Sequence, residues 1–175
     1  FARNTFRLSG MLNLNSWVTP DRRNLILLNP DVLATVLRYV QIGSQDSEAG
    51  GILLGKVRAG NLEIIEATEP TRKDWRSRFF FVRHQNDHQK IVKQRWEDSQ
   101  GQVRYLGEWH THPEDFPSPS GTDLREWRVL AESRIDGRPL LAVIVGRKGL
   151  HVEYMHKDGR RVLLSHLLET CLSLV

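Results

Sequence analysis

The stretch GEWHTHPEDFPSPSGTD, from Gly107 to Asp123, constrains the fold of this chain more than any other part of it. His110 and His112 stand two residues apart, and residues at that spacing point to the same face of a β-strand. Pro113 cannot donate a hydrogen bond to the strand ladder, so we expect the strand to end there. An apolar pattern typical of a helix begins just after Asp123. The sequence therefore predicts a strand, a turn and a helix that folds back towards the histidines.

Two imidazoles and a carboxylate in this stretch form a ligand set suited to a divalent metal. A catalytic zinc ion commonly has three such protein ligands and keeps its fourth tetrahedral position for water. Structural zinc more often has four ligands, commonly thiolates, and the chain has one cysteine, Cys171. We therefore predict that His110, His112 and Asp123 bind zinc, and that the pKa of a zinc-bound water falls to about 7.

Each half of this pattern also has an interpretation that requires no function. A histidine pair on one face of a strand is more often polar surface or hydrogen-bonded core than a pair of metal ligands. Ser120 and Asp123 have the spacing of a capping box, which stabilises the start of a helix. Asp123 could both cap the helix and bind a metal, so these two interpretations of the Ser120–Asp123 half are compatible. Capping does not account for the histidines, so the combination of the two halves favours the metal site.

The combined pattern H-x-H-P-x6-S-x-x-D resembles the motif of the JAMM, or MPN-type, zinc metalloproteases. These enzymes also use a glutamate that lies far upstream, before an apolar strand with two adjacent glycines. Here Glu48 precedes the run AGGILLG. The resemblance covers residues 24–156, and the combined motif is much more specific than either half.

The metal chemistry and the resemblance together suggest a role for each residue of the site. His110, His112 and Asp123 would hold the zinc ion. Glu48 would accept a proton from the attacking water and pass it to the leaving amine, as general base and then general acid. Ser120 would donate a hydrogen bond to the oxyanion that forms when the carbonyl becomes tetrahedral.

Two alternatives concern the choice of glutamate. Without the downstream motif, Glu48 would be interpreted as a solvated loop acid. Glu108 shares strand parity with the two histidines, so it is a rival for the role of base or a residue that orients a metal ligand. The resemblance favours Glu48.

The resemblance implies a zinc-dependent isopeptidase or peptidase that cleaves after the extended C-terminal tail of a ubiquitin-like or similarly conjugated protein. The layout of the chain resembles in particular the bacterial JAMM deconjugases of CBASS anti-phage operons. In those operons an E1/E2-like enzyme conjugates the C-terminus of a CD-NTase to targets, and the JAMM protein reverses the reaction. Two alternatives stay open: a processing protease for a bacterial ubiquitin-like or sulfur-carrier precursor, and a non-catalytic MPN interaction scaffold.

Composition limits the remaining possibilities. A chain of 175 residues with 39% apolar and 26% charged residues suits one globular domain. We expect an N-terminal arm over residues 1–22 and the metalloprotease domain over residues 23–175. No apolar run approaches the ~20 residues of a membrane helix, and no secretory signal segment opens the chain. We therefore expect a cytoplasmic protein without a membrane partner. The net charge of +4 does not suggest direct binding of nucleic acid.

Hydrophobic periodicity predicts an α/β fold, in which a mixed sheet is flanked by helices as in the JAMM fold. The expected strands are 25–28, 49–55, 62–65, 103–109, 140–145 and 150–154, and the expected helices begin at Pro30, at Asn86 or Asp87, at Leu124 and at Arg161.

Two segments have less certain patterns. Residues 70–83 are rich in arginine and aromatic residues, so they could dock a substrate. We favour a strand with a buried aromatic face and a solvated basic face. Residues 161–175 carry leucines on one face of a helix, which would either cover the sheet or contact a partner. We favour the first, because amphipathic helices are usually core elements.

Overall fold

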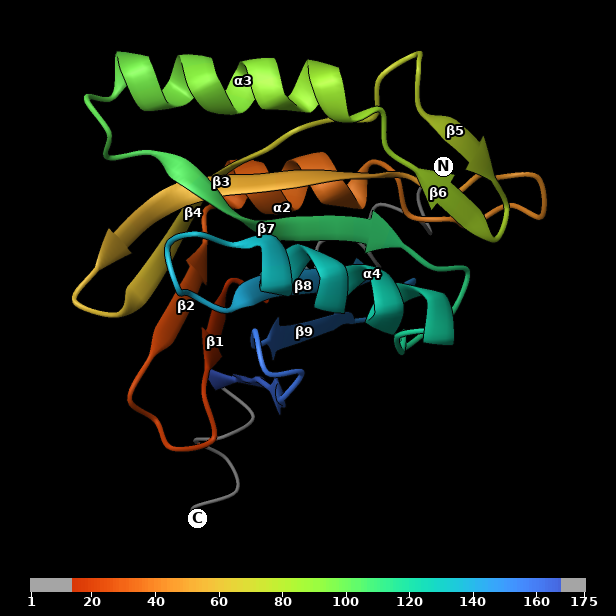
Figure 1. Ribbon diagram of the computed structural model, residues 1–175. Helices are drawn as coiled ribbons and strands as arrows, with labels where there is room; N and C mark the ends of the chain where they lie inside the picture. Colours follow the sequence, from red (N-terminus) through yellow and green to blue (C-terminus); the bar gives the residue numbers. More distant parts are fainter. Residues whose placement is uncertain (1–13, 168–175) are drawn as a thin grey trace.

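The computed structural model describes residues 14–167, which form a large mixed sheet with helices on both faces (Figure 1). The strand order is β10-β9-β8-β7-β3-β4-β2-β1-β11. The strands are β1 (Ser16–Val18), β2 (Leu25–Leu28), β3 (Gly50–Arg58), β4 (Asn61–Ala67), β7 (Arg104–Thr111), β8 (Leu140–Val145), β9 (Leu150–Met155), β10 (Arg161–Leu163) and β11 (Ser165–His166). A separate hairpin consists of β5 (Trp75–Ser77) and β6 (Phe80–Val82). The predicted α/β fold class is confirmed.

The two edges of the large sheet meet. Strands β10 and β11 are separated by Leu164 alone, yet β10 pairs with β9 and β11 pairs with β1 at the other end of the strand order. The backbone N–H of Leu164 also donates to the carbonyl of Val152, at 2.9 Å. The sheet therefore curls into a barrel-like shape, with an inner and an outer face.

Helix α2 (Pro30–Leu37) packs against the inner face. Its predicted apolar stripe is buried and belongs to the same core cluster as Leu141, Val143 and Tyr154 from β8 and β9. The helix begins with proline at its first position, where a missing N–H costs nothing. Asn29 occupies the N-cap position, although its side chain makes no capping hydrogen bond.

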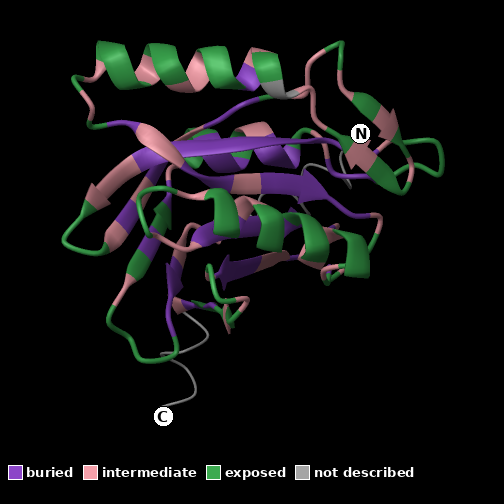
Figure 2. Ribbon diagram, viewed as in Figure 1, coloured by how far each residue is buried: buried purple, intermediate pink, exposed green. Residues whose placement is uncertain are grey.

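Helices α3 (Gln85–Asp98) and α4 (Gly121–Ser133) cover the outer face (Figure 1). Strand β8 shows why both faces need cover, because all six of its residues are buried. Leu141 and Val143 point inwards, whereas Leu140 and Ala142 pack against Trp127 of α4. The sides of α3 and α4 that point away from the sheet are exposed (Figure 2). Among the described residues, no helix is long and apolar enough to cross a membrane.

The predicted helix over residues 161–175 is wrong for its first part. Residues 161–166 form β10 and β11, and residues 168–175 lie outside the described part of the chain. Leu163 is exposed and Leu164 is buried, which is the alternation of a strand. Pairing with β9 and β1 outweighs the local helical pattern. Within the predicted N-terminal arm, β1 pairs with β2 and buries Trp17 and Val18 in the core.

The favoured interpretation of residues 70–83 is also wrong. The segment is the β5–β6 hairpin, and Trp75, Phe79 and Phe80 are exposed on it. Arginine side chains point inwards instead. Arg76 donates hydrogen bonds to backbone carbonyls, and the Arg83 side chain is only 16% exposed. Both guanidinium groups have partners in these partly buried positions, because Arg76 donates to the carbonyls of Glu48 and Ser47 and Arg83 pairs with Glu108.

Candidate metal centre

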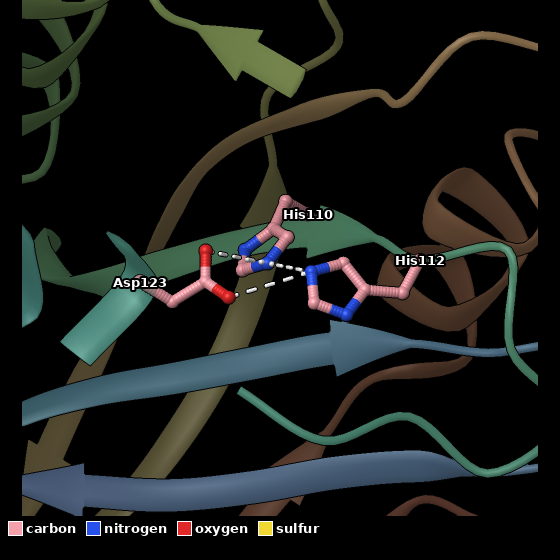
Figure 3. Close-up of side chains that lie close together, drawn as sticks. All are labelled: His110, His112 and Asp123. Carbon is pink, nitrogen blue, oxygen red and sulfur yellow. Dashed lines mark hydrogen bonds and ion pairs between the residues drawn. The ribbon is translucent and has the colours of Figure 1, made fainter. Parts of the chain in front are cut away.

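The two histidines lie where β7 ends, on the outer face of the sheet. His110 is part of β7, and the N–H of His112 continues the pairing by donating to the carbonyl of Val145 at the end of β8, at 3.0 Å. Both side chains are 11% exposed. Their Nε2 atoms are 3.0 Å apart, so the predicted same-face arrangement is confirmed (Figure 3).

Helix α4 brings a carboxylate to these nitrogens through its first turn. The Oγ atom of Ser120 accepts from the N–H of Asp123 at 3.2 Å, and Oδ2 of Asp123 accepts from the N–H of Ser120 at 2.6 Å. This is the predicted capping box. The same carboxylate reaches the histidines, with Oδ1 at 3.3 Å from Nε2 of His110 and Oδ2 at 3.4 Å from Nε2 of His112. Capping therefore holds Asp123 in place beside the imidazoles.

The three side chains fit a zinc ion in both chemistry and geometry. Ligand atoms about 2.1 Å from a tetrahedral zinc ion lie roughly 3.4 Å from one another. The separations between the two Nε2 atoms and the Asp123 oxygens are 3.0, 3.3 and 3.4 Å. His110, His112 and Asp123 also form a group whose possible ligand atoms all lie within 4.8 Å of one another. The side chains can therefore share one ion with little rearrangement.

The charges of the cluster favour an ionised carboxylate. Burial alone would raise the pKa of Asp123, but hydrogen bonds from His110 and His112 hold this pKa well below its usual range. Burial alone would lower the pKa of His112, yet its hydrogen bond and charge interaction with Asp123 raise it. The ionised carboxylate of Asp123 is ready to bind a cation, whereas His112 must release its proton before its ring nitrogen can bind a metal.

Strand pairing places Glu48 beside the histidines. Gly50 lies opposite His110 in the antiparallel register of β3 and β7. The pairing continues past β3, because the N–H of Thr111 donates to the carbonyl of Ala49 at 2.8 Å and the N–H of Ala49 donates to Oγ1 of Thr111 at 3.0 Å. Extending this register one residue further brings Glu48 level with His112.

The β5–β6 hairpin holds the backbone of Glu48. The N–H of Glu48 donates to the carbonyl of Ser77 at 2.7 Å, and the Glu48 carbonyl accepts from Nε of Arg76 at 2.6 Å. Arg76 also donates to the carbonyl of Ser47, at 3.4 Å. The carboxylate of Glu48, by contrast, makes no hydrogen bond with the residues that the structure describes. Its backbone is therefore fixed while its side chain stays available.

Burial raises the pKa of Glu48 to about 7, with the charge of His112 opposing this change and the charge of Asp123 adding to it. The residue as a whole is only 6% exposed. A carboxyl group with a pKa near neutrality can both accept and return a proton at physiological pH. The electrostatic influence of two of the metal-binding candidates also indicates that Glu48 lies close to them.

The glycines that follow Glu48 are needed for close packing. A Cβ atom on Gly50 would lie 2.6 Å from the Phe81 ring and 2.7 Å from the carbonyl oxygen of Trp109. One on Gly51 would lie 2.2 Å from the carbonyl oxygen of Thr68. All three distances are far below van der Waals contact. The hairpin and β7 can approach β3 only because side chains are absent here.

Glu108, the rival glutamate, lies on β7 near the histidines, but its carboxylate has hydrogen-bond and ion-pair partners of its own. Its Oε1 atom accepts from the hydroxyl of Tyr105 at 2.6 Å and lies 2.9 Å from Nη2 of Arg83. Burial raises the pKa of Glu108 to about 7, opposed by the charge of Arg83. Its charge interactions are with Arg83 and Glu126, which are not among the three metal-binding candidates.

All five residues predicted for the site line one cavity of about 720 Å³. The hairpin forms one wall and α4 the other. The lining includes Glu48, His110, His112, Ser120 and Asp123, together with Glu108, Phe79–Arg83, Glu126, Trp127, Val129 and Leu130.

Sequence reasoning missed the residues that position Glu48 and Glu108. Arg76 and Arg83 were noticed only as members of a basic and aromatic run, and Thr111 and Tyr105 were not singled out. Arg76, Arg83 and Thr111 act through contacts with residues distant in sequence. Tyr105 contacts Glu108 three residues away, a spacing that regular strand alternation does not bring to one face. No local spacing indicates such contacts.

Comparisons with known proteins give a consistent result. A model described as prokaryotic homologs of the JAB domain matches residues 33–161. A protein named CD-NTase/cGAS isopeptidase from Pseudomonas aeruginosa (strain BWHPSA011 / Pa011) is 45% identical over 152 residues, covering 87% of this chain and 96% of that protein. A protein of the same name from Escherichia coli (strain TW11681) is 35% identical, covering 81% of this chain and 89% of its own length.

A third protein with that name, from Vibrio cholerae serotype O1 (strain ATCC 39315 / El Tor Inaba N16961), is 38% identical, covering 71% of this chain and 78% of its own. The solution structure of a protein from Desulfitobacterium hafniense shares the fold, with a TM-score of 0.55 at 18% identity over 81% of this chain and 90% of that one. The family model covers most of the chain, and the relatives align along most of their length. The chain therefore belongs to the prokaryotic JAB-domain family.

Proposed function

We propose that this chain is a metal-dependent isopeptidase that releases a CD-NTase-type protein from its conjugates. The observation that carries the proposal is the convergence of His110, His112 and Asp123 in one cavity with Glu48. The relatives named CD-NTase/cGAS isopeptidase support the hydrolase class and the substrate, because one of them is 45% identical over 96% of its length.

Zinc is the metal that we propose for this site. Two imidazoles and a carboxylate are ligands that zinc accepts readily, and three protein ligands leave a position for solvent. When bound, zinc would lower the pKa of a water molecule to about 7 and polarise the scissile carbonyl. His110, His112 and Asp123 would hold the ion, and the capping hydrogen bond from the N–H of Ser120 would keep the Asp123 carboxylate aimed at it.

Glu48 is the residue that we propose to move protons. Its free carboxylate would accept a proton from the attacking water and deliver it to the nitrogen of the leaving amine. Amide hydrolysis needs this second step because an unprotonated amine is a poor leaving group. The hydrogen bonds from Arg76 and to Ser77 fix the backbone of Glu48, so the carboxylate would reach both positions by side-chain rotation alone.

Ser120 would stabilise the oxyanion. Its Oγ atom accepts a hydrogen bond from the N–H of Asp123, which leaves the hydroxyl hydrogen free to donate. Ser120 is exposed and lines the cavity. A donor in that place typically contributes about 3 kcal/mol to transition-state stabilisation.

The substrate that we propose is a protein joined to its target through an extended C-terminal tail. An E1/E2-like conjugating enzyme encoded nearby would form the bond that this chain cleaves. We place the reaction in the cytoplasm, since a chain with one cysteine has no need of an oxidising compartment.

Expression from the native operon tests this proposal. Cells that produce Glu48→Gln should accumulate a CD-NTase conjugate of increased mass, which the wild-type chain removes when it is added to the purified material. The purified variant should still contain about one zinc per chain by elemental analysis. Glu63→Gln, which changes a glutamate on β4, is the matched control and should accumulate none. Equal conjugate levels in the wild type and in Glu48→Gln would refute the proposal.

An assay with the wild-type protein distinguishes the proposed deconjugation from the alternative function, processing of a precursor protein. Incubation with fusions of bacterial ubiquitin-like or sulfur-carrier precursors should leave them intact while the CD-NTase conjugate is cleaved. Cleavage of the precursors alone would assign the chain to precursor processing.

A further inference from the structure

The barrel-like sheet has a second cavity, at the end that α2 does not fill. Helix α2 follows the C-terminal end of β2, where the N–H of Asn29 donates to the carbonyl of Ile64 on β4. The second cavity lies at the opposite ends of these strands, beside Asn24 and Gly60, and has a volume of about 570 Å³. Mouths of β-barrels are common places for small-molecule sites, and this volume lies in the usual range.

This cavity is separate from the metal centre. Leu106 lines it and belongs to the inner core cluster, whereas His110 faces α4 on the outer side of the same strand. His110 is four positions after Leu106, which corresponds to roughly 13 Å along the strand. The two cavities have no lining residue in common. The second cavity therefore takes no part in the proposed hydrolysis.

The inner wall of the cavity is largely apolar. It is formed by side chains of the barrel interior together with two prolines from the loops at the mouth. These residues are Leu62, Leu106, Tyr154, Val162, Pro20 and Pro139. Such a wall suits the apolar or aromatic body of an organic molecule.

The mouth of the cavity carries unpaired positive charge. Three arginines line it, and Arg134 is paired with Asp136 at 2.7 Å. Arg138 and Arg160 form no ion pair within 4.0 Å with any residue between 14 and 167, and act only at longer range on Asp136 and Asp158, whose pKa values their charges lower. The carboxylate that lines the cavity, Asp21, accepts instead from the hydroxyl of Thr19 at 2.6 Å. Two guanidinium groups are therefore available to an anion.

Neutral groups beside these arginines add directional contacts. His156 accepts a hydrogen bond at Nδ1 from Arg160 at 3.1 Å, and burial lowers its pKa, which favours the neutral imidazole. The Tyr154 hydroxyl makes no hydrogen bond with the described residues. Burial raises the pKa of Tyr154, so the hydroxyl stays protonated and can donate. The mouth thus combines two cations with a phenolic donor.

We propose that this mouth binds a small organic anion with an apolar ring body, of the mononucleotide class. The anionic group would lie between Arg138 and Arg160 and accept from the Tyr154 hydroxyl. The ring body would lie against Leu62, Leu106 and the deeper barrel wall. Tight binding requires contacts with both the arginines and the apolar wall. Inorganic phosphate lacks the ring body and an uncharged nucleoside lacks the anionic group, so neither would bind tightly.

Calorimetric titration of the full chain with AMP tests this proposal. AMP should bind saturably, and inorganic phosphate and adenosine should each bind at least tenfold more weakly. The Arg138→Gln and Arg160→Gln variants should each weaken AMP binding about tenfold or more, since each loses a charge-assisted hydrogen bond. Tyr154→Phe should weaken it by a smaller factor, because the ring remains.

The matched control is Lys93→Gln, which removes one positive charge from the exposed surface of α3. Its affinity for AMP should equal that of the wild type. Circular dichroism of each variant should show the wild-type fold. The proposal is overturned if AMP shows no saturable binding, if Arg138→Gln and Lys93→Gln have the same affinity, or if adenosine binds as tightly as AMP.

Discussion

Two glutamates, Glu48 buried and Glu108 largely shielded from solvent, flank the metal-binding candidates, and they differ in what their carboxylates contact. Burial raises the pKa of both Glu48 and Glu108 to about 7. Glu108 is engaged by Arg83 and Tyr105, whereas the Glu48 side chain has no hydrogen bond with the described residues and interacts with the charges of His112 and Asp123. The comparison teaches that a perturbed pKa does not by itself identify a proton carrier. The partners of the group decide whether the proton can move.

Activity measurements on the two glutamine variants should give the largest difference. We expect Glu48→Gln to lower kcat by roughly 10³-fold or more, because it removes both proton transfers. Glu108→Gln should lower kcat much less, since it loosens a cavity wall without touching the reacting atoms. Steady-state kinetics on a fluorogenic conjugate measures both, and zinc content is the control for each. A dead Glu108→Gln enzyme beside an active Glu48→Gln enzyme would reverse the assignment.

Ser120 provides the next largest effect and separates catalysis from helix capping. Ser120→Gly should reduce kcat about 10²-fold, because it removes the proposed oxyanion donor. Glycine at an N-cap costs only a few tenths of a kcal/mol, so the free energy of unfolding should hardly change. Ser118→Ala, two residues earlier in the same loop, is the matched control for kinetics. Full activity of Ser120→Gly would restrict Ser120 to its capping role.

The raised pKa of Glu48 predicts a pH dependence of stability in the metal-free protein. Between its ordinary value of 4.5 and about 7, the folded state binds more protons than the unfolded state. The stability linked to this group is thus fully present below about pH 4.5 and is lost as pH rises through about 7. From about pH 5 to pH 8, the free energy of unfolding of the wild type should fall by roughly 1–3 kcal/mol more than that of Glu48→Gln.

Urea unfolding of both proteins after chelation checks this expectation. Parallel pH profiles for the wild type and Glu48→Gln would show that the carboxyl group is not desolvated in the folded state.

A double-mutant cycle on Arg83 and Glu108 should give the smallest effect. The side chains are 16% and 13% exposed and their charged atoms lie 2.9 Å apart. We expect a coupling free energy of about 1–2 kcal/mol from chemical unfolding of Arg83→Gln, Glu108→Gln and the double variant. In each variant KM should rise more than kcat falls, because the ion pair of Arg83 with Glu108 holds the end of the hairpin against β7 at the cavity. A coupling free energy of zero would show that the ion pair between Glu108 and Arg83 does not stabilise the fold.

The metal-binding candidates could be predicted because their signal is local. His110 and His112 share a face whenever the segment is a strand, and Ser120 and Asp123 form a capping box whenever a helix begins there. Glu48 was identified through the resemblance to JAMM enzymes. Its position depends on the register of β3 and β7, which pairs residues about sixty apart in sequence.

Two wrong predictions show where local patterns fail. The predicted segment 161–175 has leucines at helical spacing, but backbone groups of residues 161–166 pair with β9 and β1 and so close the sheet. The aromatic residues of the hairpin were expected in the core. Instead Phe79 and Phe80 are exposed, while Arg76 turns inwards to the carbonyls of Ser47 and Glu48.

The sequence by itself determined the candidate metal ligands, the order of most elements and the α/β class, because each follows from side-chain chemistry at short spacing or from hydrophobic period. Only the tertiary structure decided which glutamate has a free carboxylate, which face of the hairpin is buried and that the sheet closes around a second cavity. Those features depend on contacts between residues far apart in the chain. Such contacts are set by strand register and packing, and neither can be predicted from the local sequence.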